Sequence, residues 1–120
     1  MSNSDIVRRA FAAVEANDVD TYVSLFTDDA VYQAANFPPV IGPEGIRQFA
    51  TPVMETFSRV IHDITAMWEP ERDLVIAEIV LTYHRKDGKV IKLPCLDVIR
   101  LHGGKIASLQ AYLDISPAFA

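Results

Sequence analysis

The sequence predicts an α+β domain in which helices cover one face of a curved, mainly antiparallel sheet. Apolar residues recur at helical spacing in the first half of the chain, whereas from Val60 onward they follow strand-like patterns. The turn-forming segments EPERD, KDG and HGG separate four strand-like stretches. A half-hydrophobic chain of 120 residues is the size of one domain with one core, so we expect a single domain over residues 1–120.

Three helices are expected before the sheet. The first spans residues 4–16, with Ser4 as its N-cap, because apolar side chains repeat there at helical spacing. A short second helix follows at 19–27. The third spans 44–59 and begins after Pro43, a residue that suits the first turn of a helix.

A brief strand is expected at 30–33, between the second and third helices, and an irregular loop follows it at 34–43. That loop contains Pro38 and Pro39, and consecutive prolines cannot continue a helix or a central strand. The four long strands are, in chain order, VIHDITAMW, LVIAEIVLTYH, KVIKLPCLDVIRL and KIASLQAYLDI. Helices first and an antiparallel meander afterwards predict a sheet with helices on one face.

Charge and composition exclude several classes of partner. The net charge is −5 and Lys and Arg cluster only in the short RKDGK turn, which argues against nucleic acid or an anionic membrane as partner. No uncharged apolar run approaches the roughly 20 residues that span a bilayer, and MSNSDIVRR lacks the apolar core of a signal peptide, so we expect a cytoplasmic protein. The three histidines show no metal-ligand spacing, and we expect neither a metal nor another cofactor.

One residue of the segment LPCLDVIRL stands out, because Asp97 lies at the centre of an apolar, β-prone stretch. Aspartate is almost never fully buried unless it is hydrogen-bonded, paired or protonated, since desolvating its charge is costly. A neighbouring group must therefore accommodate this carboxyl.

The hairpin before this strand predicts a partner for Asp97. Asp-Gly is a strong signal for a two-residue hairpin turn, and if Lys86 and Lys89 close it, Glu78 lies opposite Asp97 and Val80 opposite Cys95. The other face of the sheet would then carry Ala77, Ile79, Leu81, Leu96 and Val98.

Two interpretations of this predicted carboxylate pair are open. In the first, two like charges on an apolar face share a proton, so that a neutral acid donates a hydrogen bond while its ionised partner accepts a proton. In the second, the face is wet, or a β-bulge shifts the register and each carboxylate finds its own donor.

The order of elements, together with the runs VRRAFAAVEANDVDTYVSLFTDDAVY and LDVIRLHGGKIASLQAYLDI, resembles the nuclear transport factor two superfamily and its SnoaL-like branch. The resemblance covers nearly the whole chain. It implies a sheet curled into a cone around the helices, with an apolar pocket at the open end. It does not define the reaction, because this scaffold carries isomerases, cyclases, dehydratases, hydrolases and binding proteins.

Two enzyme classes of this superfamily are each matched at one polar position. Asp97 falls where ketosteroid isomerases, which resemble this chain in a DVIRL-like strand, hold a protonated aspartate, but their tyrosine and base fall at Ala10 and at Gln33 or Ala34. The segment VYQAANFPPVIG resembles a loop of limonene-epoxide hydrolases. Tyr32 matches their water-holding tyrosine, whereas their remaining water-activating residues are missing.

Other candidates each have a structural alternative. Leu109 and Leu113 would line the pocket by resemblance, and Asn36 would orient a substrate, although asparagine is often a turn residue. His62 is either a partly buried, hydrogen-bonded histidine or a general base. Trp68 would cover a ligand or lie at an interface. Cys95 is a small, inert core residue that would contact substrate, as would Val80 opposite it.

Two functions follow as hypotheses. The first is a cofactor-independent enzyme for acid/base chemistry on a small apolar oxygenated molecule, with Asp97 as acid, Glu78 as base or proton-sharing partner and Tyr32 as orienting group. The second is a non-catalytic domain that binds a small molecule or a partner. A homodimer through the apolar sheet face is expected in either case.

Overall fold

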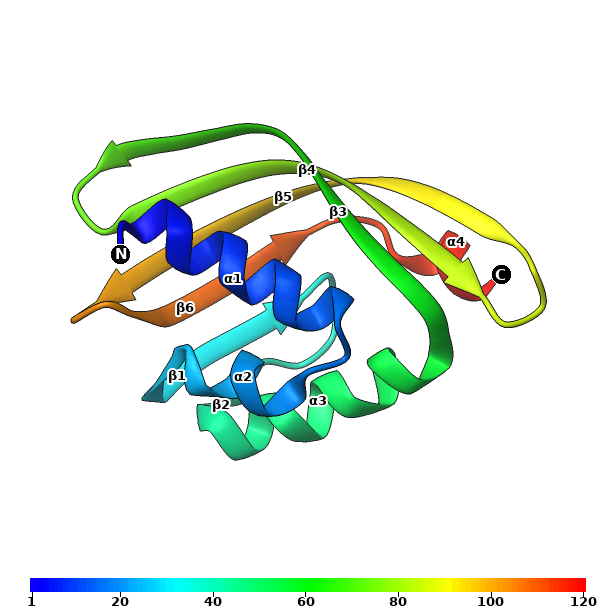
Figure 1. Ribbon diagram of the computed structural model, residues 1–120, viewed down its shortest axis with the longest axis horizontal. Helices are drawn as coiled ribbons and strands as arrows, with labels where there is room; N and C mark the ends of the chain where they lie inside the picture. Colours follow the sequence, from blue (N-terminus) through cyan, green and yellow to red (C-terminus); the bar gives the residue numbers. More distant parts are fainter.

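The computed structural model describes all 120 residues, which form four helices and six strands (Figure 1). In chain order they are α1 (Asn3–Glu15), α2 (Val19–Ser24), β1 (Phe26–Ala34), β2 (Val40–Ile41), α3 (Gly42–Thr56), β3 (Phe57–Glu71), β4 (Leu74–Arg85), β5 (Val90–His102), β6 (Lys105–Tyr112) and α4 (Ser116–Phe119). No helix is long and apolar enough to cross a membrane.

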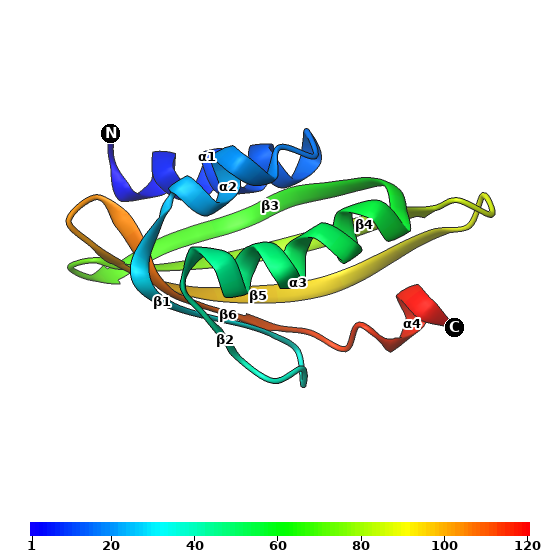
Figure 2. The same ribbon diagram turned by 90° about the horizontal axis from the view of Figure 1, so that it is seen from below.

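All six strands belong to one curved, unclosed sheet with the order β2-β1-β6-β5-β4-β3. Neighbouring strands are antiparallel except β1 and β6, which run parallel and bring the first strand of the chain beside the last. The helices lie on the concave side of this sheet, where α1 packs against β3 and α3 packs against β1 and β3 (Figures 1 and 2). The core forms between them and includes Phe26, Ile46, Ile79, Ile99 and Ile106. The predicted α+β class is confirmed.

Several predicted boundaries differ from the structure by a few residues. Ser2, not Ser4, caps α1, because the Ser2 hydroxyl accepts from the Asp5 amide while the Asp5 carboxylate accepts from the Ser2 amide. α2 ends at Ser24, and β1 begins at Phe26, four residues before the predicted strand. The strand begins earlier than predicted because Phe26 already pairs with Ile106 of β6, before a shift in register that ends at Val31.

The predicted register of the β4–β5 hairpin is wrong by one residue. The Arg85 amide donates to the Lys89 carbonyl at 2.8 Å and the Gly88 amide donates to the Arg85 carbonyl at 3.0 Å, so three residues form the turn. Gly88 has φ of +91°, the left-handed conformation that such a loop requires at its last position. As a result Glu78 lies opposite Leu96, and Asp97 lies opposite Ala77.

This shift reverses the face assigned to several residues. Ala77, Ile79 and Leu81 are buried in the core on the concave side and cannot form an interface. Leu96 is on the convex side, where Trp68 and Tyr112 are exposed as well. Of the five residues assigned to the dimer face, only Leu96 and Val98 lie on the convex side, and a homodimer through the sheet stays a prediction.

Candidate functional site

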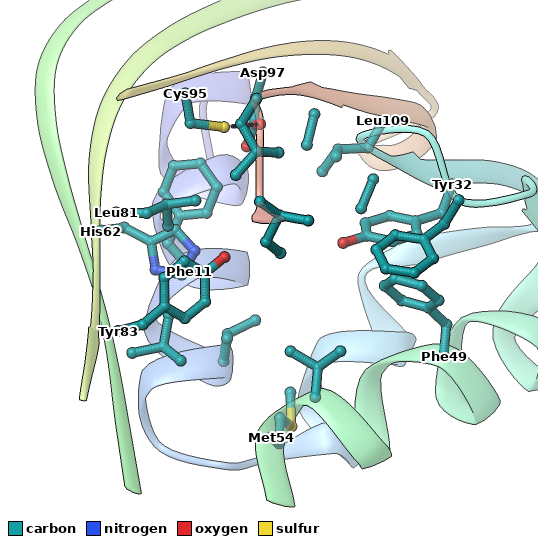
Figure 3. Close-up of a pocket in the computed structure, with 18 of the residues that line it drawn as sticks. Phe11, Tyr32, Phe49, Met54, His62, Leu81, Tyr83, Cys95, Asp97 and Leu109 are labelled. Atoms are coloured by element: carbon teal, nitrogen blue, oxygen red, sulfur yellow. Dashed lines mark hydrogen bonds between the residues drawn. The ribbon is translucent and has the colours of Figure 1, made fainter. Parts of the chain in front are cut away.

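A cavity of about 310 Å³ lies between the concave side of the sheet and the helices (Figure 3). Of its 22 lining residues, 18 are hydrophobic, so the space is suited to an apolar molecule. Its aromatic lining residues are Phe11, Tyr22, Tyr32, Phe37, Phe49, Tyr83 and Phe119. Polar groups are few in this wall, and they therefore determine which chemistry the cavity allows.

Asp97 enters this cavity from the middle of β5. Its strand neighbours are Ala77 on β4 and Ala111 on β6, two small residues that leave the space above the carboxyl uncovered. The residue is only 5 % exposed, and its one hydrogen bond is accepted by Oδ1 from the Cys95 thiol at 3.3 Å. Asp97 takes part in none of the ion pairs of the protein.

This environment favours the protonated form of Asp97. Burial raises the pKa of its carboxyl from 3.8 to about 7, and the weak hydrogen bond from the Cys95 thiol opposes the rise only in part. The carboxyl therefore exchanges its proton near neutral pH, and it can donate a hydrogen bond in one state and accept a proton in the other.

Three tyrosines accompany Asp97 in the cavity wall, Tyr22 from α2, Tyr32 from β1 and Tyr83 from β4. Burial raises the pKa of each phenol above 10, and the charge of Asp97 contributes in the same direction. Tyr32 and Tyr83 lie on opposite sides of the cavity, with Asp97 between and above them in Figure 3. Phenols that stay protonated are hydrogen-bond donors for an oxygen of a bound molecule.

His62 on β3 also lines the cavity and is its only histidine. Its Nδ1 lies 3.0 Å from Glu15 Oε2, and its backbone amide donates to the same oxygen at 3.0 Å. The imidazole stacks on the ring of Phe11 with centroids 4.5 Å apart and planes 7° from parallel. Burial lowers the pKa of His62 below 6.5, and the Glu15 carboxylate opposes this effect.

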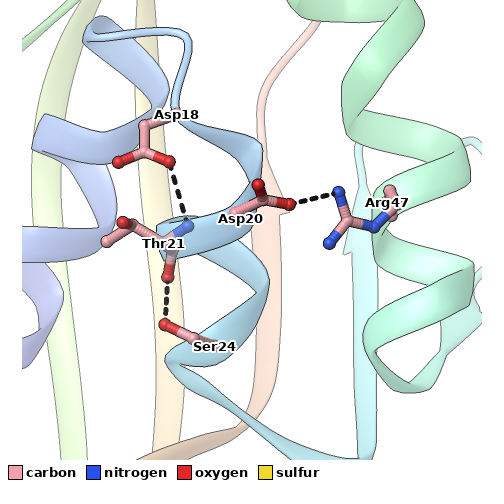
Figure 4. Close-up of polar contacts among 5 residues, drawn as sticks. All are labelled: Asp18, Asp20, Thr21, Ser24 and Arg47. Atoms are coloured by element: carbon pink, nitrogen blue, oxygen red, sulfur yellow. Dashed lines mark hydrogen bonds and ion pairs between the residues drawn. The ribbon is translucent and has the colours of Figure 1, made fainter.

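On the helical side of the cavity, polar contacts cap α2 and join α2 to α3 (Figure 4). Asp18 accepts a hydrogen bond from the Thr21 amide at 3.1 Å and thereby caps α2, the helix that carries Tyr22. Arg47 of α3 forms an ion pair with Asp20 of α2 at 2.7 Å. The ion pair is exposed, so it adds little to the stability of the fold.

The predicted site residues divide into two groups. Those that line the cavity are Asp97, Tyr32, Cys95, Leu109, Leu113 and His62. Those that lie outside it are Glu78, Val80, Asn36 and Trp68. The predicted Glu78–Asp97 pair does not exist, because Glu78 is exposed on the convex side, where Thr65 donates a hydrogen bond to its Oε1 at 2.7 Å. Asp97 therefore owes its raised pKa to burial and not to a second carboxylate.

The other three displaced residues have separate reasons. Val80 follows Glu78 to the convex side with the corrected register. Trp68 is paired with Ile76 beyond a bulge in β3 and is 49 % exposed. Asn36 lies exposed in the turn after β1, as its alternative reading as a turn residue implies.

The sequence reasoning missed several lining residues, chiefly Tyr22, Tyr83, Phe49 and Met54, and the contact of Glu15 with His62. Tyr83 shares its face with Leu81 and Ile79, so the alternating pattern of β4 contained a signal for it. Glu15 and His62 are 47 residues apart, and no sequence pattern joins them. No group of three or more His, Cys, Asp or Glu side chains in the protein could hold a metal ion.

Comparison with solved structures identifies the same architecture in other proteins. A hypothetical protein from Catenulispora acidiphila with a ketosteroid isomerase-like fold, in complex with trimethylamine, superposes with a TM-score of 0.86 at 25 % identity, over 96 % of this chain and 89 % of that one. A putative SnoaL-like polyketide cyclase from Jannaschia sp. CCS1 superposes with a TM-score of 0.83 at 18 % identity, over 98 % and 88 % of the two chains.

A putative polyketide cyclase from Xanthomonas campestris superposes with a TM-score of 0.83 at 20 % identity, over 96 % of this chain and 92 % of that one. No protein of curated function matches the sequence. Residues 7–109, which include Asp97, His62 and the three cavity tyrosines, match the SnoaL-like domain family. The chain therefore belongs to the SnoaL-like domain family.

Proposed function

We propose that the protein is a cofactor-independent enzyme that performs acid/base chemistry on a small, mostly apolar oxygenated molecule bound in the cavity. The observation that supports this most strongly is Asp97, a carboxyl with a single protein hydrogen bond that reaches an apolar space and has a pKa of about 7. A group whose pKa lies near the working pH is suited to general acid/base catalysis.

In this proposal the protonated Asp97 donates a hydrogen bond to a carbonyl or ether oxygen of the substrate. Negative charge develops on that oxygen as a proton leaves a neighbouring carbon or as a bond to oxygen breaks. Tyr32 and Tyr83 add donors from the sides of the cavity. Because the wall is mostly apolar, each donor is worth more than it would be in water. Isomerisation, cyclisation and dehydration all use such a step.

The polyketide cyclase names of the two relatives from Jannaschia and Xanthomonas agree with an oxygenated carbon skeleton as substrate. The cavity volume of about 310 Å³ lies at the lower end of the range for small-molecule sites, roughly 300–1,000 Å³. We therefore infer a substrate of one or two rings and not a long chain.

A second candidate function is binding of a small organic cation without turnover. The relative from Catenulispora acidiphila was solved in complex with trimethylamine. In the present cavity an ionised Asp97 surrounded by Tyr22, Tyr32 and Tyr83 offers one negative charge and several aromatic faces, the features that bind an alkylammonium ion.

The experiment that tests the proposal compares Asp97→Asn with Glu78→Gln against a panel of small ketones, enones and phenolic ketones. Glu78→Gln is the matched control, because it removes a carboxylate on the convex side, away from the cavity. We expect turnover of a substrate found with the native protein to fall by about 100-fold or more in Asp97→Asn and to be unchanged in Glu78→Gln. Native turnover in Asp97→Asn would contradict the proposal.

The pH dependence of binding separates the two candidate functions. A neutral ligand that accepts a hydrogen bond from protonated Asp97 binds more weakly as the pH rises through about 7. Trimethylammonium would bind more tightly over the same range, because its charge favours the ionised carboxyl. Tight binding of the cation, with every oxygenated compound recovered unchanged, would favour the binding function.

A further inference from the structure

The contact between Glu15 and His62 fixes the protonation of the imidazole ring. Glu15 Oε2 accepts a hydrogen bond from the backbone amide of His62 at 3.0 Å, and the same oxygen lies 3.0 Å from His62 Nδ1. An ionised carboxylate only accepts hydrogen bonds, so the neutral imidazole must carry its proton on Nδ1. The lone pair of the neutral ring is then on Nε2.

Nε2 forms no hydrogen bond within the protein. Every fully buried side-chain nitrogen or oxygen of the protein does form one, so Nε2 is not fully buried. This nitrogen must therefore reach open space. The side chain of His62 is only 10 % exposed and it lines the cavity, and stacking on Phe11 holds the ring plane fixed. In Figure 3 His62 lies at the left of the cavity beside Leu81 and Tyr83, and Asp97 lies at its top beside Cys95.

We propose that His62 is the general base of this cavity and that Glu15 is its positioning residue. The inference rests on the proposed function, since Asp97 supplies the acid. An enzyme that moves a proton between two positions of a substrate needs an unprotonated base and a protonated acid at the same pH.

The environments of the two groups provide that combination. Burial lowers the pKa of His62 below 6.5, with Glu15 opposing, whereas burial raises the pKa of Asp97 to about 7. The other titratable groups lining the cavity are Tyr22, Tyr32, Tyr83 and Cys95, all with raised pKa values and therefore neutral. Neutral imidazole and protonated carboxyl thus coexist between the two pKa values, and activity should follow a bell-shaped profile centred there.

Nε2 of His62 removes a proton from a carbon next to a carbonyl, and the electron pair of the C–H bond moves toward the carbonyl oxygen, which accepts a hydrogen bond from Asp97. The imidazolium then returns its proton to another carbon, which gives an isomerisation. Alternatively the carbanion attacks a second carbonyl carbon of the same molecule, which closes a ring and leaves an alkoxide that the imidazolium protonates.

The competing explanation is structural, because Glu15 and His62 also connect α1 to β3. The backbone amide contact alone would serve that purpose. Nitrogen-15 NMR of the histidine rings separates the two roles. We expect His62 to be protonated on Nδ1 at pH 7.5 and to shift toward the Nε2-protonated form in Glu15→Gln. An Nε2-protonated His62 in the native protein would overturn the proposal.

The functional test uses 5-nitrobenzisoxazole, a planar aromatic probe for a base in an apolar site. A base removes its ring C–H proton, the N–O bond breaks, and a nitrile and a phenoxide form without any co-reactant. We expect the native protein to exceed the buffer rate, His62→Gln to lose about tenfold or more, and Glu15→Gln to lose less while its pH profile shifts to lower pH. His84→Gln is the control, since His84 does not line the cavity.

A native rate no faster than buffer, or equal rates in His62→Gln and His84→Gln, would overturn the assignment of His62 as base. If instead Asp97 were not the acid of the proposed function, the result would differ. Asp97→Asn would then convert 5-nitrobenzisoxazole at the native rate, while His62→Gln would still lose activity.

Discussion

Replacement of Asp97 by asparagine is expected to raise the free energy of unfolding at pH 8 by about 2 to 4 kcal/mol. The pKa of this carboxyl is about 7 in the folded protein and 3.8 in its ordinary state. A shift of about three pKa units corresponds to about 4 kcal/mol, which sets the upper bound. Asparagine has the shape of the protonated acid and carries no charge to desolvate.

The direction of the pKa shift of Asp97 determines the pH range over which the stability of the native protein changes. Because the folded state holds the proton more tightly than the unfolded state, the native protein loses stability as the pH rises from about 4 to about 7 and stays at the lower level above that. The gain in Asp97→Asn should therefore be small at pH 4 and largest at pH 8. Urea unfolding of both proteins at the two pH values measures it.

Asp63→Asn is the control, since it removes an exposed carboxylate from β3, and it should change stability little at either pH. A loss of stability in Asp97→Asn at pH 8, or an equal gain at pH 4 and pH 8, would contradict the account. A variant that gains stability and loses activity would identify Asp97 as a residue kept for function at a cost to the fold.

Phe26→Ala is expected to reduce the free energy of unfolding by about 3 to 5 kcal/mol. Phe26 is 1 % exposed and its ring lies edge-on to Tyr22 at 5.1 Å and to Tyr32 at 6.4 Å. Removal of the ring leaves a void behind both tyrosines. The loss is a large share of the roughly 5–15 kcal/mol that stabilises an ordinary domain.

Phe37→Ala is the matched control for this change. Phe37 is 40 % exposed and contacts Phe49 at 5.6 Å, so its loss should cost less than half as much. Comparison of chemical denaturation midpoints at equal slopes measures both effects. Equal losses in the two variants would show that Phe26 does not support the cavity wall in the way described.

The fold was predictable because its signals are local. The change from helical to strand periodicity near Val60, and the turns between the strands, come from neighbouring residues in the chain. Asp97 was identified for a similar reason, since one carboxylate within an apolar strand conflicts with its surroundings whatever the register. The assignment of Asp97 to the concave side depends on its own strand, in which Leu93, Cys95 and Ile99 point the same way.

The partner of Asp97 could not be predicted in the same way, because it depended on the length of one turn. The sequence KDG suits a two-residue turn, but the structure uses three residues, and one residue of shift exchanges every contact across the two strands. Glu78 thereby moved from the presumed site to the convex side. The contact of Glu15 with His62 was not predictable, since it arises only when α1 packs on β3.

The central claim is that Asp97 exchanges its proton near neutral pH because it is buried in an apolar cavity. Carbon-13 NMR titration of the aspartate carboxyls, in the native protein and in Glu78→Gln, tests it directly. The account predicts one carboxyl that titrates near pH 7, disappears in Asp97→Asn and is unchanged in Glu78→Gln. If every carboxyl titrated near the ordinary value of about 4, Asp97 would be hydrated and the acid/base proposal would fall.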